Sequence, residues 1–307
     1  MTEREERVTR LSYSALSSYA ECGERFRLER LYGIKSGTWW VTLAGSAGHT
    51  VTELFDRGEL AIEDMEDAWV AEFAKEEAKA VEEGREIRAS GRMNKTGLSK
   101  SGGPNKKDKD WCLHFFPGFV QNYVDWRLAT GWEIWSDDEH VGIELPIDAP
   151  MADENFKGFV DRVFVVPTDF SDLTAAVLRG GDEVPDTTML VCVDLKFGNT
   201  PSSTMQLGTY RVGLLKQYGI DMAKGTYFMA ADGKPTSLTD LSRYTPEFIE
   251  AQYEMAWRGI RAGVFLPNVS SFCNSCGVRE YCRAYGGQDA DRFPLLEVDQ
   301  GMPDTLA

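Results

Sequence analysis

The stretch VCVDLKFG, residues 191–198, decides how the chain folds, because it sets two charges in an otherwise apolar and β-branched run. Side chains alternate between the two faces of a strand, so Asp194 and Lys196 project from the same side, about 7 Å apart. Charges on a buried strand must be paired or bound to a metal. Taken alone, this D-x-K pattern is also typical of a structural salt bridge at a strand end.

A second aspartate lies in GFVDRV, residues 158–163, where Asp161 stands among alternating apolar residues. If the two strands pair as a hairpin, Asp161, Asp194 and Lys196 converge at one edge of a sheet. Carboxylate oxygens of this kind suit magnesium or manganese. Such a site can polarise a phosphodiester and lower the pKa of a bound water, while a lysine orients the nucleophile or offsets developing charge.

Three further polar residues are candidates for the same site. His49, in GSAGHTVTELF, is a possible third ligand whose imidazole would favour manganese, although a lone helical histidine is often merely packed. Gln206 and Tyr210 follow the D-x-K strand at helical i, i+4 spacing and share one face. An ordinary amphipathic helix explains that spacing equally well.

The cysteines form the second pattern. Cys273, Cys276 and Cys282 make a C-x2-C-x5-C run, and Cys22 could supply a fourth thiolate. Paired C-x2-C knuckles, the usual zinc-ribbon signature, are missing, and a 4Fe-4S cluster tolerates the irregular spacing better. In either case we interpret the site as a structural staple that ties the two ends of the chain together. Cys112 is the weaker candidate for the fourth ligand, because it sits in an apolar helical run and is expected to pack there, and Cys192 is expected to pack beside Asp194.

The pattern of elements predicts an α/β fold. Short β-branched and aromatic segments suggest strands at 141–147, 157–166, 189–197 and 225–230. Helical periodicity suggests helices from Ser12 or Ser14 to Tyr32, from Ser46, over Ile62–Ile87, Trp111–Leu128, Ser203–Tyr218 and Pro246–Arg261. We divide the chain into a helical region 1–140, a core 141–265 with a polar insertion at 168–188, and a Cys-rich region 266–307.

Composition narrows the function classes. A hydrophobic fraction of 42% excludes wholesale disorder, and the absence of a long apolar run or an apolar leader predicts a cytoplasmic protein without a membrane span. The net charge of −16 argues against nucleic acid, but residues 89–110 hold six lysines and arginines against two acids. That basic loop is either a solvated insertion or an arm that contacts phosphates.

Six motifs in order resemble one known family. LSYSALSSYAECGERFRLERLYGI, GHTVTELF, GFVDRV, VDLKFG, QLGTY and the terminal C-x2-C-x5-C are similar to the RecB-like branch of the PD-(D/E)XK nucleases, typified by the CRISPR-associated Cas-four exonucleases and their phage relatives, and to the AddB nuclease domain. The resemblance implies a restriction-endonuclease-like core sheet flanked by helices, Mg²⁺- or Mn²⁺-dependent phosphodiester hydrolysis, and a 4Fe-4S cluster.

The resemblance also implies a role for each matching residue. The family's metal ligands correspond to His49, Asp161, Asp194 and the carbonyl of Leu195, and its catalytic lysine corresponds to Lys196. The motif that follows the lysine corresponds to Gln206 and Tyr210. The cluster ligands correspond to Cys22, Cys273, Cys276 and Cys282. Glu144 lies on the preceding strand, where some relatives carry an acid. Gly23 replaces the family's usual proline, which should loosen a turn without removing a ligand.

We therefore expect a metal-dependent exonuclease acting on DNA ends, with single-stranded ends preferred, in recombination, repair or phage DNA processing. The basic loop and exposed aromatics such as Trp39 and Trp40 would track the strand by phosphate contact and stacking. Without a P-loop, processivity would need a helicase, recombinase or CRISPR adaptation partner. The alternatives are a non-cleaving iron–sulfur subunit for DNA binding or assembly, and a zinc-stapled protein without a nucleic-acid role.

Overall fold

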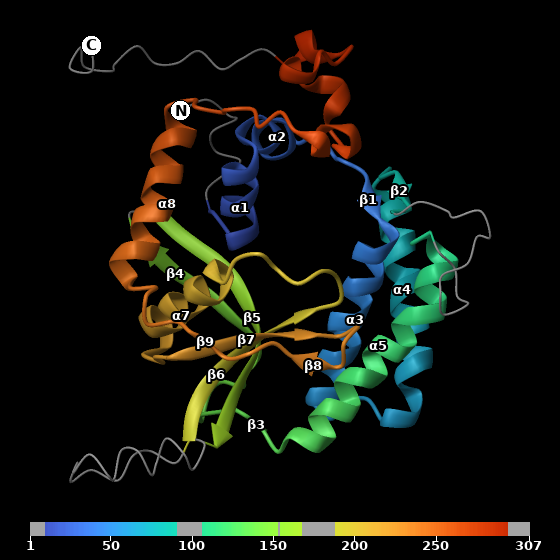
Figure 1. The fold of residues 1–307 in the computed structure, drawn as a ribbon, viewed down its shortest axis with the longest axis vertical. Coiled ribbons are helices and arrows are strands. Elements are labelled where there is room, and N and C mark those ends of the chain that lie inside the picture. The colour runs from blue at the N-terminus through green and yellow to red at the C-terminus, as the bar shows by residue number, and fades with distance from the viewer. Residues whose placement is uncertain (1–9, 91–105, 153, 168–187, 294–307) are drawn as a thin grey trace. The chain divides into compact units, whose positions relative to one another are not determined.

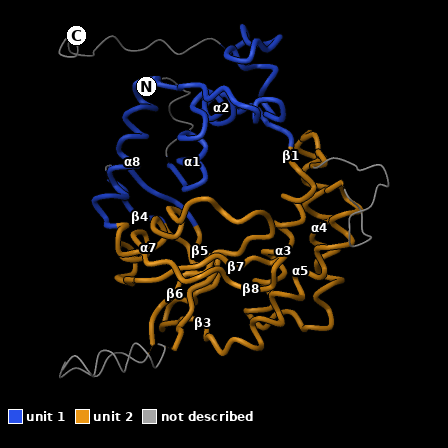
Figure 2. Tube along the Cα trace, in the orientation of Figure 1, with its two compact units in different colours: residues 1–37, 148–158, 245–307 blue, residues 38–147, 159–244 orange. Residues whose placement is uncertain are grey.

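The computed structural model describes residues 10–90, 106–152, 154–167 and 188–293, which divide between two compact units (Figures 1 and 2). Unit 1 combines Met1–Gly37, Asp148–Gly158 and Thr245–Ala307, and unit 2 combines Thr38–Ile147 and Phe159–Tyr244. Each unit thus joins segments that are distant in sequence. The regions 1–140, 141–265 and 266–307 that we expected from the sequence group residues by their expected function, and that division stays a prediction.

Among the described residues, one mixed sheet of seven strands forms the framework of the fold. Its strand order is β3-β5-β6-β7-β8, with β4 also pairing with β5 and β9 with β7. These strands are β3 (Glu133–Ile134), β4 (Ile143–Met151), β5 (Glu154–Pro167), β6 (Thr188–Lys196), β7 (Lys224–Met229), β8 (Lys234–Pro235) and β9 (Thr239–Asp240).

The central strands have the pairing that the sequence predicted. β5 and β6 are antiparallel, with Val163 opposite Cys192, so the two aspartate-bearing strands are neighbours. β6 and β7 are parallel, with Asp194 opposite Tyr227. A parallel pair requires a crossover connection, and helix α7 (Met205–Tyr218) supplies it. The expected α/β core with a central sheet flanked by helices is confirmed.

Alternation along β6 separates the two faces of the sheet in unit 2. Val191, Val193 and Leu195 are buried in the hydrophobic core with residues of α3 (Trp40–Asp56), α4 (Met65–Glu82) and α5 (Lys109–Thr130), three helices that pack together (Figure 1). Asp194 instead contacts Gln206 of α7. One face of β6 is therefore apolar and supports the fold, and the other carries the charges.

The helical layer of unit 2 is built around aromatic rings. Trp69 of α4 is fully buried, stacks on Phe73 and Phe116 with ring centroids 5.0 and 5.7 Å apart, and donates its Nε1–H to the Ala44 carbonyl at 3.2 Å. Satisfying that donor lets the large ring be buried without an unpaired polar group. The 3₁₀ turn Ile62–Asp64 and the parallel strands β1 (Thr38–Trp39) and β2 (Ile87–Arg88) complete this part of the unit.

Unit 1 contains α1 (Tyr13–Glu21), α2 (Gly23–Phe26), a π-helical turn Arg27–Leu31, and α8 (Pro246–Arg261). The side chain of Ser12 caps α1 by accepting from Ala15 N at 3.2 Å, and Thr245 caps α8 in the same way. Short 3₁₀ turns follow at Ser271–Ser275, Arg279–Tyr281, Arg283–Tyr285 and Ala290–Arg292.

Several predicted boundaries were wrong. The expected helix from Ser12 to Tyr32 is interrupted at Cys22, whose extended backbone separates α1 from α2. The helix expected from Ser46 begins at Trp40, and the helix expected to reach Ile87 ends at Glu82. Periodicity carries little information about where backbone hydrogen bonding stops.

Candidate active site

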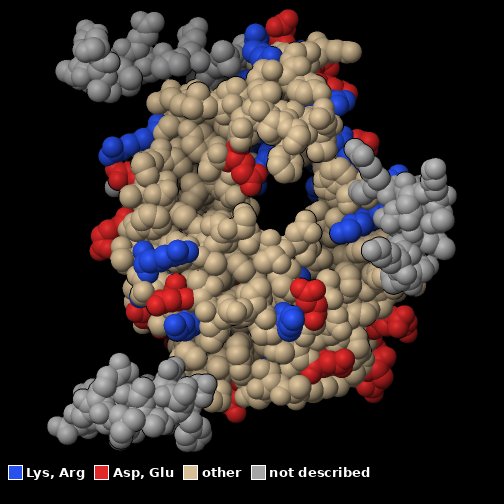
Figure 3. Space-filling view, viewed as in Figure 1, with Lys and Arg blue, Asp and Glu red and all other residues tan. Residues whose placement is uncertain are grey.

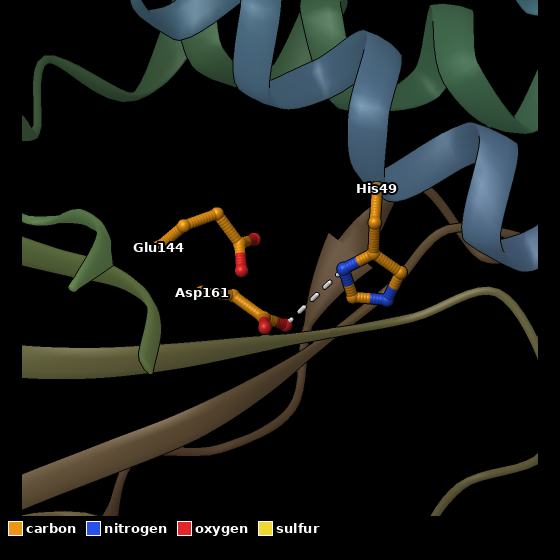
Figure 4. A group of neighbouring side chains, drawn as sticks. All are labelled: His49, Glu144 and Asp161. Atoms are coloured by element: carbon orange, nitrogen blue, oxygen red, sulfur yellow. Dashed lines mark ion pairs between the residues drawn. The ribbon is translucent and has the colours of Figure 1, made fainter. Parts of the chain in front are cut away.

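Three ligand-type side chains of unit 2 come together beside the sheet. His49, Glu144 and Asp161 each offer one ligand atom, and these atoms all lie within 4.8 Å of one another. His49 Nδ1 is 3.6 Å from Asp161 Oδ2, and Figure 4 shows the imidazole and both carboxylates directed toward a common point. This is the geometry expected of residues that could hold a single cation. We call the three residues the cation group.

Each member comes from a different element, so the site exists only when the unit is folded. His49 lies in α3, Glu144 in β4 and Asp161 in β5. The ring of Phe197 lies 5.5 Å from the His49 ring and also contacts Gly48, where an added Cβ would meet ring atoms at 2.6 Å. The absence of a side chain at Gly48 therefore lets α3 approach the end of β6 closely enough for His49 to reach Asp161.

Glu144 has an unusual backbone. Its φ of 46° lies in the left-handed region, which residues other than glycine enter at a cost and often at functional sites. The sequence only suggested this residue from its position on the strand before Asp161. No local pattern announced the left-handed turn, because Glu144 follows Gly142 and Ile143 in an ordinary β-branched run.

Asp194 and Lys196 form a second group beside the first. Lys196 Nζ lies 2.6 Å from Asp194 Oδ2 and donates to Gln206 Oε1 at 3.2 Å. Gln206 in turn donates through Nε2 to Asp194 Oδ1 at 2.7 Å and to the Tyr210 hydroxyl at 2.8 Å. The residues that the sequence placed at i, i+4 on one helix face thus reach the D-x-K strand, and a purely amphipathic role does not account for them.

The two groups share a backbone link at Leu195. Its amide donates to Asp161 Oδ2 at 2.6 Å, which anchors the Asp161 carboxylate beside β6. His49, Asp161, Asp194, Lys196 and Leu195 therefore lie in one neighbourhood. Their roles as ligands and catalytic groups remain predictions.

The electrostatics of the neighbourhood favour a cation. Burial, followed by the charge of Asp161, raises the pKa of both Glu144 and Asp194 to about 7, and burial also raises the pKa of Asp161. Burial lowers the pKa of His49 to about 4, although 35% of its side chain is exposed, so the ring is neutral and available as a ligand near pH 7. Clustered carboxylates repel one another, and a divalent ion would relieve that repulsion.

The residues present fit a divalent cation. Asp194 Oδ2 is buried and is paired with Lys196 Nζ at 2.6 Å, so its charge is balanced even without an ion. The ligand atoms of His49, Glu144 and Asp161 lie within 4.8 Å of one another, close enough to bind the same ion. Two or three carboxylates with one imidazole form a hard donor set that suits magnesium and, with the nitrogen, manganese.

The four cysteines predicted to act together all belong to unit 1. Asn268 N donates to Cys22 Sγ at 3.5 Å, and Cys273 Sγ donates to the Asn268 carbonyl at 3.9 Å. The pKa values of Cys276 and Cys282, raised mainly by burial, are raised further by Cys22. Asn268 therefore contacts both Cys22 and Cys273, and binding of one cluster by all four thiols stays a prediction.

The spacing of these thiols differs from a single-ion site. None of the four belongs to a group of described residues whose ligand atoms lie within 4.8 Å of one another. A polynuclear cluster does not require such close sulfurs, because each thiolate binds a different metal ion. All four are free and partly exposed, whereas Cys112 and Cys192 are fully buried, in agreement with the packing role expected of them.

Gly23, which was expected to loosen a turn, instead lets two segments of unit 1 pack closely. Its amide donates to the Leu266 carbonyl at 2.9 Å, a bond that proline could not make. An added Cβ would lie 2.8 Å from Leu266 N and 2.9 Å from Phe265 Cα. The glycine therefore lets the chain after Cys22 lie directly against the segment that leads to the other three cysteines.

Only some of the residues that were predicted to contact DNA are among the described residues. Residues 91–105 of the basic loop and the insertion at 168–187 lie outside the described residues. Trp39 and Trp40 are half-buried rather than exposed, and Lys109 lies 5.7 Å from the Trp40 ring centroid while pairing with Glu77. On the face shown in Figure 3, the coloured basic and acidic side chains are intermixed. Phosphate contact by this loop remains a prediction.

Buried charges next to Asp161 were missed by the sequence reasoning. Arg162 and Asp56 are almost completely buried and form an ion pair at 2.6 Å. The available signal was the arginine itself, since a charge that alternates onto the apolar face of a strand must find a buried partner.

Among the described residues, no helix is both long and apolar enough to cross a membrane.

Comparison with known proteins agrees with this arrangement. A sequence model of the PD-(D/E)XK nuclease superfamily matches residues 10–177, which include the cation group and end before β6. The Gene 69 protein of Mycobacterium phage L5 is 24% identical over 321 residues, covering 93% of this chain and 100% of that protein. The Gene 69 protein of Mycobacterium phage D29 is 26% identical over 291 residues, covering 89% and 96% respectively.

Proposed function

Because the chain belongs to the PD-(D/E)XK nuclease superfamily, whose members are hydrolases that act on phosphodiester bonds, we propose that it is a metal-dependent exonuclease of the RecB-like branch that degrades DNA from its ends. The two relatives belong to phages, which is consistent with a role in phage DNA processing or recombination. The observation that carries the proposal is the meeting of the cation group with the Asp194–Lys196 pair in one unit.

In this proposal, His49, Glu144, Asp161 and Asp194, with the carbonyl of Leu195, hold Mg²⁺ or Mn²⁺. When bound, such an ion polarises the scissile phosphate and lowers the pKa of a water molecule. The imidazole of His49 would bind in its neutral form, and the amide of Leu195 already fixes the carboxylate of Asp161.

Lys196 has the geometry of a group that contacts the reacting phosphate. Its side chain is 26% exposed while Asp194 beside it is only 2% exposed, so the ammonium remains accessible from the site. Gln206 holds both Lys196 and Asp194, and Tyr210 holds Gln206. A lysine fixed in this way offsets charge that develops on the phosphate, and it loses little freedom when the substrate binds.

We further propose that Cys22, Cys273, Cys276 and Cys282 bind a 4Fe-4S cluster that staples α1 to the segment after α8. The support is that all four cysteines belong to unit 1 and that Asn268 contacts two of them, Cys22 and Cys273. Cys276→Ser should abolish the brown colour and lower the melting temperature, whereas Ser275→Ala in the same turn should change neither. Stoichiometric zinc in a colourless protein would replace the cluster with the zinc-stapled alternative.

The test of the activity uses end-labelled linear DNA, single- and double-stranded, beside covalently closed circles, with Mg²⁺ or Mn²⁺. Loss of linear DNA alone is expected from the wild-type protein, with single-stranded ends consumed faster. Asp194→Asn and Lys196→Ala should abolish it. Asp221→Asn is a matched control, because it removes a carboxylate from a surface pair with Arg211.

Two outcomes would contradict the proposal. Cleavage of closed circles would make the protein an endonuclease. Intact linear DNA with cluster-loaded wild-type protein would favour the alternative, a non-cleaving iron–sulfur subunit that assembles with a helicase, recombinase or CRISPR adaptation protein. The ordered Lys196, Gln206 and Asp194 contacts argue against that alternative, since a site that no longer cleaves has no need to keep them.

A further inference from the structure

A buried ion-pair network lies directly behind the cation group. Arg162 is fully buried, and its Nε donates to Asp56 Oδ2 at 2.6 Å. Its Nη1 donates to the carbonyl of Asp161 at 2.6 Å and lies 3.4 Å from Glu144 Oε1. Arg162 therefore contacts two of the three residues of the cation group, one through its backbone and one through its side chain.

The contacts of Arg162 differ in length, and this difference bears on how Glu144 is held. The two short bonds fix the guanidinium between α3 and β5, and Thr52 Oγ1 accepts from Nη2 at 3.5 Å. The contact with Glu144 is the longest of the charged ones. A fixed donor at that distance restrains the Glu144 carboxylate without saturating its oxygens, so lone pairs remain for a cation.

Asp56 holds the guanidinium from the other side. Besides Arg162, it accepts from Arg127 Nε at 2.9 Å and from the Tyr123 hydroxyl at 2.5 Å, and only 1% of its side chain is exposed. Burial opposes the charge of Arg162, but Tyr123 and Asp56 more than offset this effect and raise its pKa. The guanidinium is therefore a permanent charge in a rigid frame built from α3 and α5.

The backbone of Glu144 does not by itself fix the direction of the side chain, so the carboxylate needs a fixed partner such as Arg162. The left-handed φ of 46° turns this residue out of regular strand geometry, and 24% of its side chain is exposed. A flexible glutamate in that position would sample several rotamers, whereas an ion pair with a fixed partner selects one. The observed rotamer brings the carboxylate within 4.8 Å of the His49 and Asp161 ligand atoms.

We propose that Arg162, held by Asp56, is a positioning residue that aims the carboxylate of Glu144 at the catalytic cation. The inference rests on the proposed function, because it takes Glu144 to be a ligand of that cation. The competing explanation is that Arg162 only stabilises the packing of α3 and α5 against the sheet. The two explanations differ in whether the effect of Arg162 passes through Glu144.

The experiment is a double-mutant cycle on Mn²⁺ binding to the full chain without DNA, with free Mn²⁺ measured by electron paramagnetic resonance. The variants are Arg162→Lys, Glu144→Gln and the double variant. Arg162→Lys keeps the charge and removes the planar fork. We expect each single variant to bind Mn²⁺ about tenfold or more weakly, the range known for residues that orient metal ligands. The double variant should be no weaker than Glu144→Gln alone.

Additive losses would overturn the proposal, because Arg162 would then act independently of Glu144. Unchanged binding in Glu144→Gln would also overturn it, since Glu144 would not be a ligand. If Arg162→Lys does not fold by circular dichroism, Asp56→Asn takes its place in the same cycle. Asp221→Asn serves as the control, an aspartate paired with Arg211 on the surface of the same unit, and should bind Mn²⁺ normally.

The readout separates this inference from the proposed function. Mn²⁺ binding with the expected cycle but without DNA cleavage would leave the positioning role intact and reject the nuclease assignment. Binding and cleavage with an additive cycle would reject the positioning role alone. A wild-type protein that binds no Mn²⁺ would reject both.

Discussion

The contact between Gly48 and Phe197 sets how closely α3 approaches the end of β6, and Gly48→Ala tests it. A Cβ at residue 48 would lie 2.6 Å from two atoms of the Phe197 ring. That ring cannot move freely, because it is 7% exposed and stacks on Phe116 with centroids 6.1 Å apart. The substitution must therefore displace either the ring or the helix that carries His49.

The expected change in the free energy of unfolding is the sum of two opposing contributions. Replacing glycine by alanine inside a helix stabilises by about 1 kcal/mol, and overpacking a core costs about 1–3 kcal/mol. Gly45→Ala in the same helix isolates the first term, because its Cβ would meet Phe197 Cβ at an ordinary 3.5 Å. The free energy of unfolding of Gly48→Ala should therefore lie about 1–3 kcal/mol below that of Gly45→Ala.

Urea denaturation of both variants measures this difference, and Mn²⁺ titration shows whether His49 has moved. Gly45→Ala should be at least as stable as the wild type and bind Mn²⁺ normally. Gly48→Ala should be the less stable of the two and bind Mn²⁺ more weakly. Equal stability and equal binding in the two variants would refute the reasoning that Phe197 is fixed against α3.

Three other predictions follow from the same contacts. Because burial raises the pKa of Glu144 from 4.5 to about 7, its ionisation destabilises the metal-free fold as the pH rises through that range. Glu144→Gln should therefore raise the free energy of unfolding by about 1–3 kcal/mol at pH 8 in chelator but not near pH 4, and urea denaturation showing the same difference at both pH values would contradict this. Gly23→Ala should lower the melting temperature and the iron content together, since its Cβ would meet the Leu266 backbone, and a normal iron content would argue against that packing. Tyr210→Phe should slow DNA cleavage about tenfold or less while leaving the fold intact, because Gln206 keeps its bond to Asp194; complete loss of single-turnover cleavage would assign the tyrosine a direct role.

The sequence predicted the charged strand and its neighbour more accurately than it predicted the helices. Alternation in GFVDRV and VCVDLKFG indicated two strands that could pair, and β5 and β6 do pair, because the apolar faces agree in this register and a slip of one residue would reverse one of them. The end of α1 at Cys22 depends instead on the close approach of Leu266, 243 positions away from Gly23 along the chain. Contacts over such separations leave no local pattern.

The residues of the candidate site likewise fall into those that the sequence identified and those that only the structure revealed. His49, Asp161, Asp194 and Lys196 were identified from residue type and position, since hard-cation chemistry needs carboxylates and the strand period puts them on one face. Glu144 was only a candidate by position. Arg162 and Asp56 were not identified, because a buried ion pair between α3 and β5 depends on how two elements meet.

By itself, the amino-acid sequence determined which residues are candidates for the site and which strands carry them, because side-chain type and the alternation of a strand are local properties. Only the tertiary structure decided which of those residues form one group. The meeting of His49, Glu144 and Asp161 requires α3, β4 and β5 to pack together, and the bond from Gly23 to Leu266 requires two distant segments of unit 1 to pack together. Distances between elements are set by packing, and packing is a property of the whole unit.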